Sequence, residues 1–313
     1  MITFILRRLI SGVVLIVVVT GVTFFLTHAA SIPVAHNLLG PTASPAQVAH
    51  LNHQLGLDRP VVVQYFSWVA EAVRGNFGSS YFSSQPVGEA LADRLPVTLS
   101  VVLVSLLITL VISVVLGVLA ASKRGPLDFV IQAISTLSFV FPGIIIGIAL
   151  VFVFSIWLHL LPAVGYTKFQ DSPAGWFGSI ILPAIVLAIG GIASLSAQIR
   201  GSLIDELSRD YVRTLRSRGI SERSILYKHA LRNASGPAFT TFSLLFISLF
   251  GAALFVEKIF ALPGYGFYAF TATVQGDLPV MLGVTLFSVI LVVIVNLIVD
   301  LISGWLNPKA RIS

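Results

Sequence analysis

The chain has 313 residues, of which 56% are hydrophobic and only 10% are charged, and its formal net charge is +6. Soluble globular proteins carry about 25% charged residues, and a chain so poor in charge would expose more apolar surface than soluble proteins tolerate. The composition therefore excludes a soluble domain and predicts an integral membrane protein. The absence of cysteine excludes disulfides and thiolate metal sites.

Six stretches of low charge follow one another along the chain, and each is long enough to cross a bilayer as a helix of about 20 residues. They comprise residues 9–28, 95–122, 129 into the 160s, 172–199, 233–256 and 278–299. The first could be a cleaved signal peptide, but the apolar core of such a peptide is about 7–15 residues long, so we expect a retained span. The sequence thus predicts an all-α, polytopic fold with six transmembrane helices and a single domain, 1–313.

Prolines occur near the starts of four spans, at Pro96, Pro183, Pro237 and Pro279. We expect them in first helical turns, where the missing N–H has no intrahelical partner. Pro142 falls inside the third span and predicts a kink there. Gly143 and Gly147 could let another helix approach closely, although simple packing also explains this spacing.

The distribution of lysine and arginine predicts the orientation of the spans. With the N-terminus in the cytoplasm, the inner segments carry 14 of these residues and the outer segments carry 5. This asymmetry follows the positive-inside rule, so both termini are expected to be cytoplasmic. The positive charge therefore tracks the membrane, and we expect membrane lipid and no nucleic acid as a partner.

Two connections between the spans are long. Residues 31–94 are expected to form an extracytoplasmic insert, with helices at Pro45–Leu55 and Val61–Val73 and a Gly/Ser-rich turn at Gly75–Ser84. Residues 200–233 form the long cytoplasmic connection. Within it, Leu203, Leu207, Tyr211 and Leu215 recur every four residues, which predicts one helix face.

The same cytoplasmic connection contains signals for a break between two helices. Gly219 suits the left-handed residue that ends a helix, and Ser221 with Glu222 suits the start of the next one. Such a hairpin could rest on anionic lipid headgroups or dock into a groove of a partner protein. These residues alone leave both interpretations open.

The spans carry no ionisable side chain between their ends, which argues against a carrier coupled to protons or sodium. The chain also has no Gly-Lys dipeptide and hence no P-loop, so ATP would have to bind to another chain. His50 and His53 could share a metal, but no clear third ligand accompanies them. We expect no metal site, no cofactor and no enzymatic activity, and a passive channel or carrier remains the alternative.

The long cytoplasmic connection resembles the permease subunits of ABC importers. Asp210–Gly219 and His229–Ala234 are similar to the patterns D-Y-V-R-T-A-R-A-K-G and H-A-L-R-N-A of the oligopeptide/dipeptide/nickel branch. Further similar segments are Leu55–Pro60, Gly75–Ser79, Pro86–Val87, Arg94–Thr98, Val256–Gly266, Gly276–Pro279, and Asp300 with Asn307–Arg311. Asn76 stands where the branch usually has an acid, which leaves the role of that position open.

The resemblance implies the permease fold of a type I ABC importer and a complex in the cytoplasmic membrane of a prokaryote. This complex would contain a second homologous permease subunit, two ATP-binding-cassette ATPase subunits that hold ATP and Mg, and an extracytoplasmic solute-binding protein. The implied cargo is di- or oligopeptides, with nickel or another small solute as the alternative. ATP binding would drive alternating access of the pore.

The resemblance also suggests site residues. The connection at 200–233 would be the ATPase-coupling loop, with Gly219 as its break and with Tyr211, Arg213, Arg216, Glu222, His229 and Asn233 as candidate partner contacts. Glu257 and Asp277 are candidates for the translocation path or for contact with the binding protein. Pairing with Lys258 or with a neighbouring loop is the competing interpretation for Glu257.

Overall fold

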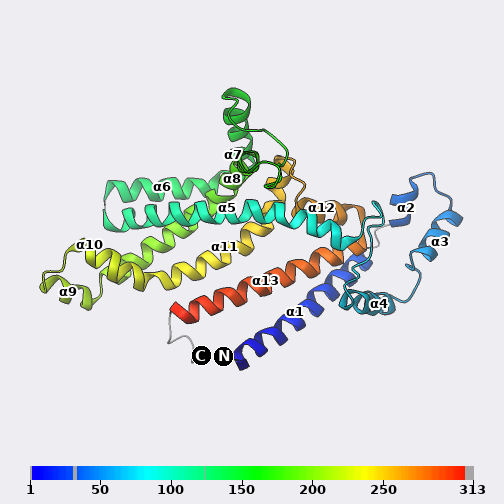
Figure 1. Cartoon of the computed structure of the whole chain (residues 1–313), viewed down its shortest axis with the longest axis horizontal. Helices are drawn as coiled ribbons and strands as arrows, with labels where there is room; N and C mark the ends of the chain where they lie inside the picture. Colours follow the sequence, from blue (N-terminus) through cyan, green and yellow to red (C-terminus); the bar gives the residue numbers. More distant parts are fainter. Residues whose placement is uncertain (1, 31–33, 124, 307–313) are drawn as a thin grey trace. The chain divides into compact units, whose positions relative to one another are not determined.

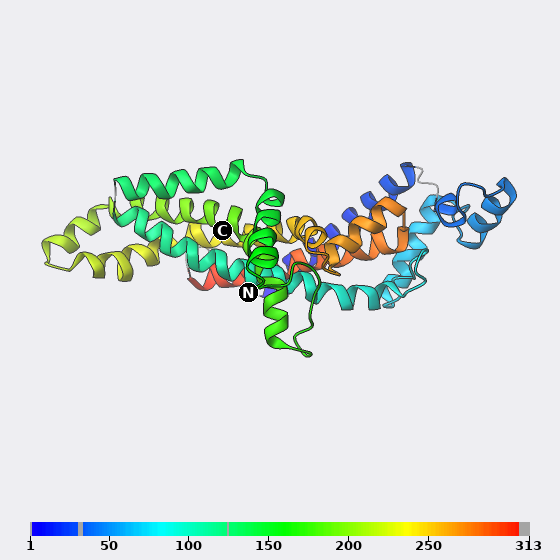
Figure 2. The same cartoon turned by 90° about the horizontal axis from the view of Figure 1, so that it is seen from above.

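The computed structural model describes residues 2–30, 34–123 and 125–306 (Figures 1 and 2). Within these ranges the chain is helical, and its extended pairing is confined to an isolated bridge between Ser79 and Pro86. The motif segment Asn307–Arg311 and the side chain of Asp300 lie outside the described part. The chain divides into two compact units, Met1–Val97 with Pro263–Leu297 and Thr98–Leu262 with Ile298–Ser313.

The first unit contains two long apolar helices and the helices of the 31–94 insert. Its elements are α1 (Ile2–Ala29), α2 (Val34–Leu39), α3 (Pro45–Gln54), α4 (Val61–Val73), the start of α5 (Val87–Ser122), α12 (Tyr265–Gln275) and most of α13 (Leu278–Leu306). Ser44 begins α3 with a capping box, in which its side chain and that of Gln47 bond to each other's backbone N–H. Helices were predicted at α3 and α4, and both are confirmed.

The second unit is built around α8 (Pro173–Leu207) and α11 (Leu231–Ile259), which pack along each other. Its other elements are the rest of α5, α6 (Pro126–Val140), α7 (Gly143–Leu150), the π-helix η1 (Val151–Trp157), α9 (Asp210–Ser217), α10 (Glu222–Ser224) and the π-helix η2 (Ile225–Ala230). Leu195, Ile199 and Leu203 of α8 form a buried cluster with residues of α5, η2 and α11. A Cβ atom on Gly117 of α5 would lie 2.8 Å from the Cβ of Ile199, so α5 and α8 approach closely there.

The described residues contain five helices that are long and apolar enough to cross a membrane, or up to six if a bent pair is counted as one span. The bent pair is α6 followed by α7 and η1, with an angle of 98° at the break. Phe141 is extended there (φ −82°, ψ 121°), as expected for a residue before proline. The kink predicted at Pro142 is confirmed, and it separates two helices.

The expected positions of three prolines were wrong. Pro96, Pro183 and Pro237 lie inside α5, α8 and α11. Helices α5 and α11 begin before their apolar stretches, at Val87 and Leu231, whereas Pro183 lies ten residues beyond the start of α8 at Pro173. Neighbouring helices and polar side chains re-satisfy the backbone groups that such prolines free in a membrane. Pro279, the second residue of α13, lies in the first turn as predicted.

The spacing of Gly143 and Gly147 does not mark a close helix contact. A Cβ atom at either position would meet neighbouring atoms at 3.6–3.9 Å, which is ordinary van der Waals contact. Simple packing therefore accounts for this pair.

Candidate functional site

The connection between α8 and α11 contains a helical hairpin, which we define as residues 208–230. The helix face predicted for Leu203, Leu207, Tyr211 and Leu215 is interrupted, because α8 ends at Leu207 and Arg209 is extended (φ −71°, ψ 152°). The hydroxyl of Ser208 donates to the carbonyl of Asp205 (2.7 Å). Serine competes with the helical pattern in this way, which explains why the regular spacing did not produce one continuous helix.

Gly219 forms the turn of the hairpin in the left-handed conformation (φ +76°). Its N–H donates to the carbonyl of Arg216 (3.0 Å), and that of Ile220 donates to the carbonyl of Leu215 (3.2 Å). These two bonds form the Schellman motif that ends a helix at glycine. The predicted break is confirmed, and a side chain here would meet no atom within 4 Å, so the backbone conformation is the constraint.

An ion pair closes the hairpin across this turn. The guanidinium of Arg216 donates to both carboxylate oxygens of Glu222, at 2.6 and 3.1 Å. The hydroxyl of Ser221 accepts from the N–H of Ser224 (3.4 Å) at the start of α10, as the sequence predicted. Two of the candidate contact residues thus bind each other in the described chain.

The base of the hairpin is held by a polar cluster, the Glu206 junction, which consists of Glu206, Arg209, Tyr211 and Asn233. Glu206 is buried, and its carboxylate accepts from Asn233 (3.1 Å) and pairs with Arg209 (2.9 Å). Asn233 also donates to the hydroxyl of Tyr211 (3.3 Å), whose pKa burial raises. The junction therefore ties the end of α8 to α9 and to the start of α11.

The sequence interpretation included Tyr211 and Asn233 but missed Glu206. Glu206 follows Ile199 and Leu203 at helical spacing and lies on the same buried face. That spacing was the available signal, because an acid on an apolar helix stripe needs a polar partner.

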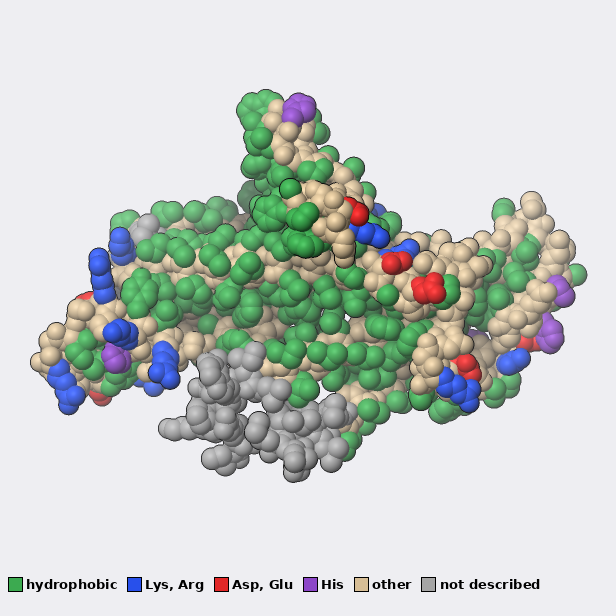
Figure 3. All heavy atoms as spheres, viewed as in Figure 1, with side chains coloured by type: hydrophobic (Ala, Val, Ile, Leu, Met, Phe, Trp, Pro, Cys, Tyr) green, Lys and Arg blue, Asp and Glu red, His purple; other side chains and the backbone are tan. Residues whose placement is uncertain are grey.

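The surface of the hairpin is basic, and Lys and Arg side chains gather over α9 and α10 (Figure 3). Arg213, Arg216 and Arg218 are exposed above the buried Val212, and His229 is half-buried. A hollow of about 810 Å³ lies beside α9, α10 and the end of α5. Its charged lining residues are Lys123, Arg213, Arg216, Glu222 and Arg223. The hairpin therefore presents a shaped, positively charged surface.

A second ion pair, missed in the sequence interpretation, joins α6 to α8. Arg200 donates to both carboxylate oxygens of Asp128, each at 2.5 Å. Bidentate pairs of this kind fix orientation as well as distance. The pair lies within the second unit and anchors the first turn of α6.

Glu257 is fully buried in the last turns of α11. The hydroxyl of Thr98 on α5 donates to its carboxylate. The acid therefore bridges two helices of the second unit, whereas the sequence interpretation considered only Lys258 or a loop as its partner.

Asp277 is 2% exposed and precedes α13 in the first unit. Its carboxylate accepts from the hydroxyl of Ser80 (2.5 Å) and from the N–H of Tyr81 (3.2 Å). Burial raises the pKa of Asp277, and burial together with the charge of Asp277 raises the pKa of Tyr81 to about 12. The acid thus locks the Gly/Ser-rich turn onto the start of α13.

A pocket of about 390 Å³ adjoins this lock within the first unit. Its lining includes Asp277, Arg94 and Tyr268, and the guanidinium of Arg94 lies 4.2 Å from the centre of the Tyr268 ring. Among the described residues, the buried hydroxyl of Tyr268 has no hydrogen-bond partner. The pocket therefore combines a cation, a buried carboxylate and a free hydroxyl.

Asn76 lies in the same turn, and both ends of its side-chain amide are hydrogen-bonded. Its amide donates to Glu71 (3.1 Å), and its side-chain oxygen accepts from the N–H of Gly78 (3.1 Å). An acid at this position could still accept from Gly78, but it would repel Glu71. Asparagine therefore suits this turn without the charge.

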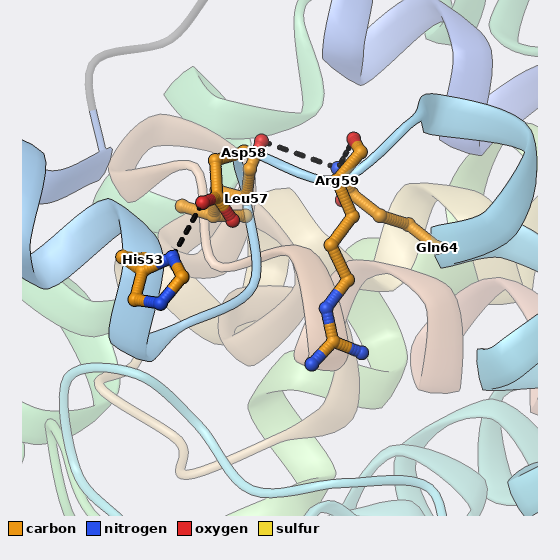
Figure 4. A network of polar contacts seen from close by, with 5 residues as sticks. All are labelled: His53, Leu57, Asp58, Arg59 and Gln64. Atoms are coloured by element: carbon orange, nitrogen blue, oxygen red, sulfur yellow. Dashed lines mark hydrogen bonds and ion pairs between the residues drawn. The ribbon is translucent and has the colours of Figure 1, made fainter.

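The segment Leu55–Pro60 joins α3 to α4 through the contacts drawn in Figure 4. His53 lies 2.6 Å from Asp58, and this hydrogen bond lowers the pKa of Asp58. Gln64 donates to the carbonyls of Leu57 (3.2 Å) and Arg59 (2.8 Å). In the described part of the chain, no group of three or more His, Asp or Glu side chains could hold a metal.

Comparisons with known sequences cover nearly the whole chain. The family described as binding-protein-dependent transport system inner membrane component matches residues 113–312, and the N-terminal part of such components matches residues 1–102. A relative from Brucella abortus (strain 2308), named for a peptide transport system permease, is 37% identical and covers 98% of both chains. The oligopeptide transport system permease protein AppB of Bacillus subtilis (strain 168) is 34% identical, with 99% of each chain covered.

A third relative is named for a different peptide. The glutathione transport system permease protein GsiC of Escherichia coli (strain K12) is 32% identical over 99% of both chains. Among solved structures, the MetNI methionine ABC transporter in an inward-facing form gives a TM-score of 0.57 at 20% identity, covering 69% of this chain and 96% of the other. That likeness concerns the fold. From the family match and these relatives, the chain belongs to the binding-protein-dependent transport system inner membrane components, the permease subunits of ABC importers.

Proposed function

We propose that this chain is one of two transmembrane subunits of an importer that moves di- or oligopeptides across the cytoplasmic membrane of a prokaryote. Two ATPase subunits would bind ATP and Mg, and an extracytoplasmic solute-binding protein would deliver the cargo. The relatives named for peptide, oligopeptide and glutathione transport support this class of cargo. Nickel or another small solute remains the alternative cargo for the same role.

The observation that carries the proposal is the hairpin at residues 208–230. A basic surface on two short helices, fixed by the turn at Gly219 and the Arg216–Glu222 pair, suits docking into a groove of a soluble partner. A flexible basic loop on lipid headgroups would not need this geometry. We therefore assign the hairpin to the ATPase interface, with Arg213, Arg216 and Arg218 on the docking side.

The Glu206 junction is the route by which motion of the hairpin would reach the membrane. Because Glu206 holds both Arg209 and Asn233, a displacement of α9 would pull on α8 and α11 together. The buried cluster around Leu203 then couples these two helices to α5. Closure of the ATPase pair would thus move three helices of the second unit as one body, which is the step that alternating access requires.

Tyr211 and His229 have separate roles in this proposal. Tyr211 belongs to the junction through its hydroxyl, so it would position α9 in addition to any contact with the partner. His229 is half-buried on η2, and it would contact the ATPase subunit from the side of the hairpin nearest α11. The role of Tyr211 rests on this hydrogen bond, and the role of His229 rests on its position in the hairpin.

Glu257 and Asp277 would belong to the translocation path only after a conformational change. Each is buried and bonded within its own unit. A peptide amine could reach either carboxylate only after the surrounding helices move. We therefore place them at steps that follow ATP binding, when the outward-facing state forms.

The test is reconstitution of the complete importer in proteoliposomes. This chain, its second permease and its ATPases would be supplied with the solute-binding protein, and ATP hydrolysis and uptake would be measured with short peptides, glutathione and a nickel chelate. We expect peptides to stimulate both activities together. Uptake without ATP would contradict the importer mechanism, and stimulation by the nickel chelate alone would contradict the peptide assignment.

A further inference from the structure

Helix α4 is apolar on the side that faces away from the protein. Its exposed residues are Val62, Val63, Phe66, Ser67, Ala70 and Val73, and none of them is charged. Phe66 is 63% exposed and Val73 is 84% exposed. A helix at a water-exposed surface carries its charged and polar residues on the side that faces away from the protein. Helix α4 carries apolar residues there instead.

Two polar residues of α4, Gln64 and Glu71, face its neighbouring loops. Gln64 and Glu71 are separated by two helical turns, and both are partly buried. Gln64 bonds to the carbonyls of Leu57 and Arg59, while Glu71 bonds to Arg74 and Asn76. Gln64 and Glu71 therefore find their partners within the protein, and the opposite, apolar side of α4 contacts no described part of the chain through a polar group.

Tyr65 fixes the depth of α4 against α1. Its buried hydroxyl donates to the carbonyl of Val17 (3.0 Å) and lies 3.0 Å from the hydroxyl of Thr20. Val17 precedes the end of α1 at Ala29 by twelve residues, which is about 18 Å along a helix. The apolar stretch of α1 begins after Arg8, so up to Ala29 it is about 30 Å long, equal to the hydrocarbon thickness. The hydroxyl therefore reaches the middle of the membrane.

The exposed apolar surface of α1 continues onto α4, which packs against it (Figure 1). The Tyr65 ring lies 6.0 Å from that of Phe25 on α1 and 5.5 Å from that of Phe66 on α4. Phe25 and Phe66 are both exposed. Two outward-facing aromatic side chains thus flank one buried ring, and no charged residue separates the two helices at this point.

We propose that α4 lies inside the lipid leaflet on the Ala29 side of the membrane, with Val62, Val63 and Phe66 in contact with acyl chains. Lipid is the occupant because this surface is continuous with that of a membrane span at the same depth. The insert 31–94 is then anchored in the bilayer through α4. This anchor holds the turn at Gly75–Ser84, and with it the Asp277 lock, at a fixed height above the membrane.

The absence of cysteine allows a direct test in the assembled importer. A nitroxide would be attached to Val62→Cys or Phe66→Cys, and its collision rates with oxygen and with a water-soluble chromium complex would be measured in proteoliposomes. Val22→Cys on the exposed face of α1 is the matched lipid control, and His50→Cys on the exposed face of α3 is the water control. We expect both α4 labels to give the ratio of oxygen to chromium collisions found for Val22→Cys.

Two results would overturn the proposal. Chromium collisions equal to those of His50→Cys would place α4 in water, and protection from both reagents would mean that another protein subunit covers it. The Val62→Cys variant keeps the test decisive if replacing Phe66 prevents assembly. The readout requires neither ATP nor cargo, so its failure is distinguishable from failure of the proposed peptide import.

Discussion

Two aspartates of the first unit illustrate how environment sets the behaviour of a carboxyl group at the residue scale. Asp277 is buried, and this burial raises its pKa from the ordinary value of 3.8. Asp58 is solvated, and its hydrogen bond to His53 lowers its pKa. Folding therefore depends on pH with opposite signs at the two sites.

Asp277 predicts a loss of stability with rising pH. Between the ordinary pKa of 3.8 and the raised value in the folded chain, the folded state binds more protons than the unfolded state, so the free energy of unfolding falls as pH rises through this window. The Asp277→Asn variant keeps an oxygen acceptor for Ser80 and lacks the titration. We expect the difference in thermal unfolding midpoint, wild type minus variant, to decrease as pH rises.

The control for this prediction is Asp58→Asn, which should show the opposite trend. The folded pKa of Asp58 lies below its ordinary value, so its contribution is present above that value and is lost as pH falls through the folded pKa. The midpoint difference, wild type minus variant, could instead change with pH in the same direction for both variants or not change at all. Either result would show that Asp277 does not titrate in this way.

Residues with a local signal were predictable, and residues whose role depends on distant partners were not. Gly219 and Ser221 were identified because a helix break needs particular residue types at adjacent positions. Ser80 was missed because its partner, Asp277, lies far away in the sequence. Asp128 and Arg200 were missed for the same reason, since the fold alone brings α6 and α8 together.

At the scale of elements, the hairpin depends on the conformation of Gly219. The left-handed conformation costs about 1–2 kcal/mol for a residue with a side chain, and β-branched residues tolerate it least. We expect Gly219→Val to open the turn and to reduce the population of the docking geometry roughly 5–30-fold. Membrane insertion should be unchanged, while uptake per ATP hydrolysed should fall in reconstituted importers.

Two variants separate conformation from the mere presence of a side chain. Asparagine tolerates the left-handed region, so Gly219→Asn should retain most of the coupling. Gly201→Ala changes a helical glycine of α8 that also has open space around it, and it should transport normally. If Gly219→Val couples uptake to ATP as well as Gly219→Asn does, the turn has no role in docking.

Hydrophobicity predicted where the long helices lie in the sequence, but it did not predict where each helix begins and ends. The apolar stretches correctly located the long helices, because a bilayer requires about 20 apolar residues whatever the fold. Charge marks the limit of the hydrocarbon and not the limit of the helix. Helix α5 therefore begins at Val87, in a polar segment, and encloses Pro96, and α8 continues past its apolar stretch to Leu207. The break at Ser208 was hidden because a side chain–backbone bond, which periodicity does not register, ends α8.

At the scale of the whole molecule, the number of spans depends on the bent pair of α6 with α7 and η1. A bend of 98° suits either a broken span or a segment that re-enters the same side. The two alternatives place every later element of the chain on opposite sides of the membrane. The charge distribution favours six spans, because only that number puts the arginine-rich hairpin on the same side as the N-terminus.

Single cysteines in this cysteine-free chain test the span number directly with a membrane-impermeant maleimide in oriented vesicles. The exposed positions Ser83 and Asp171 should react only from outside, and the exposed positions Ser122 and Ser217 only from inside. Asp171 and Ser122 flank the bent pair, so they decide between the alternatives. Labelling of both from the same side would make the pair a re-entrant segment and would move the hairpin outside, where no ATPase could reach it. Six spans with Ser217 inside are thus a necessary condition for coupling through Gly219.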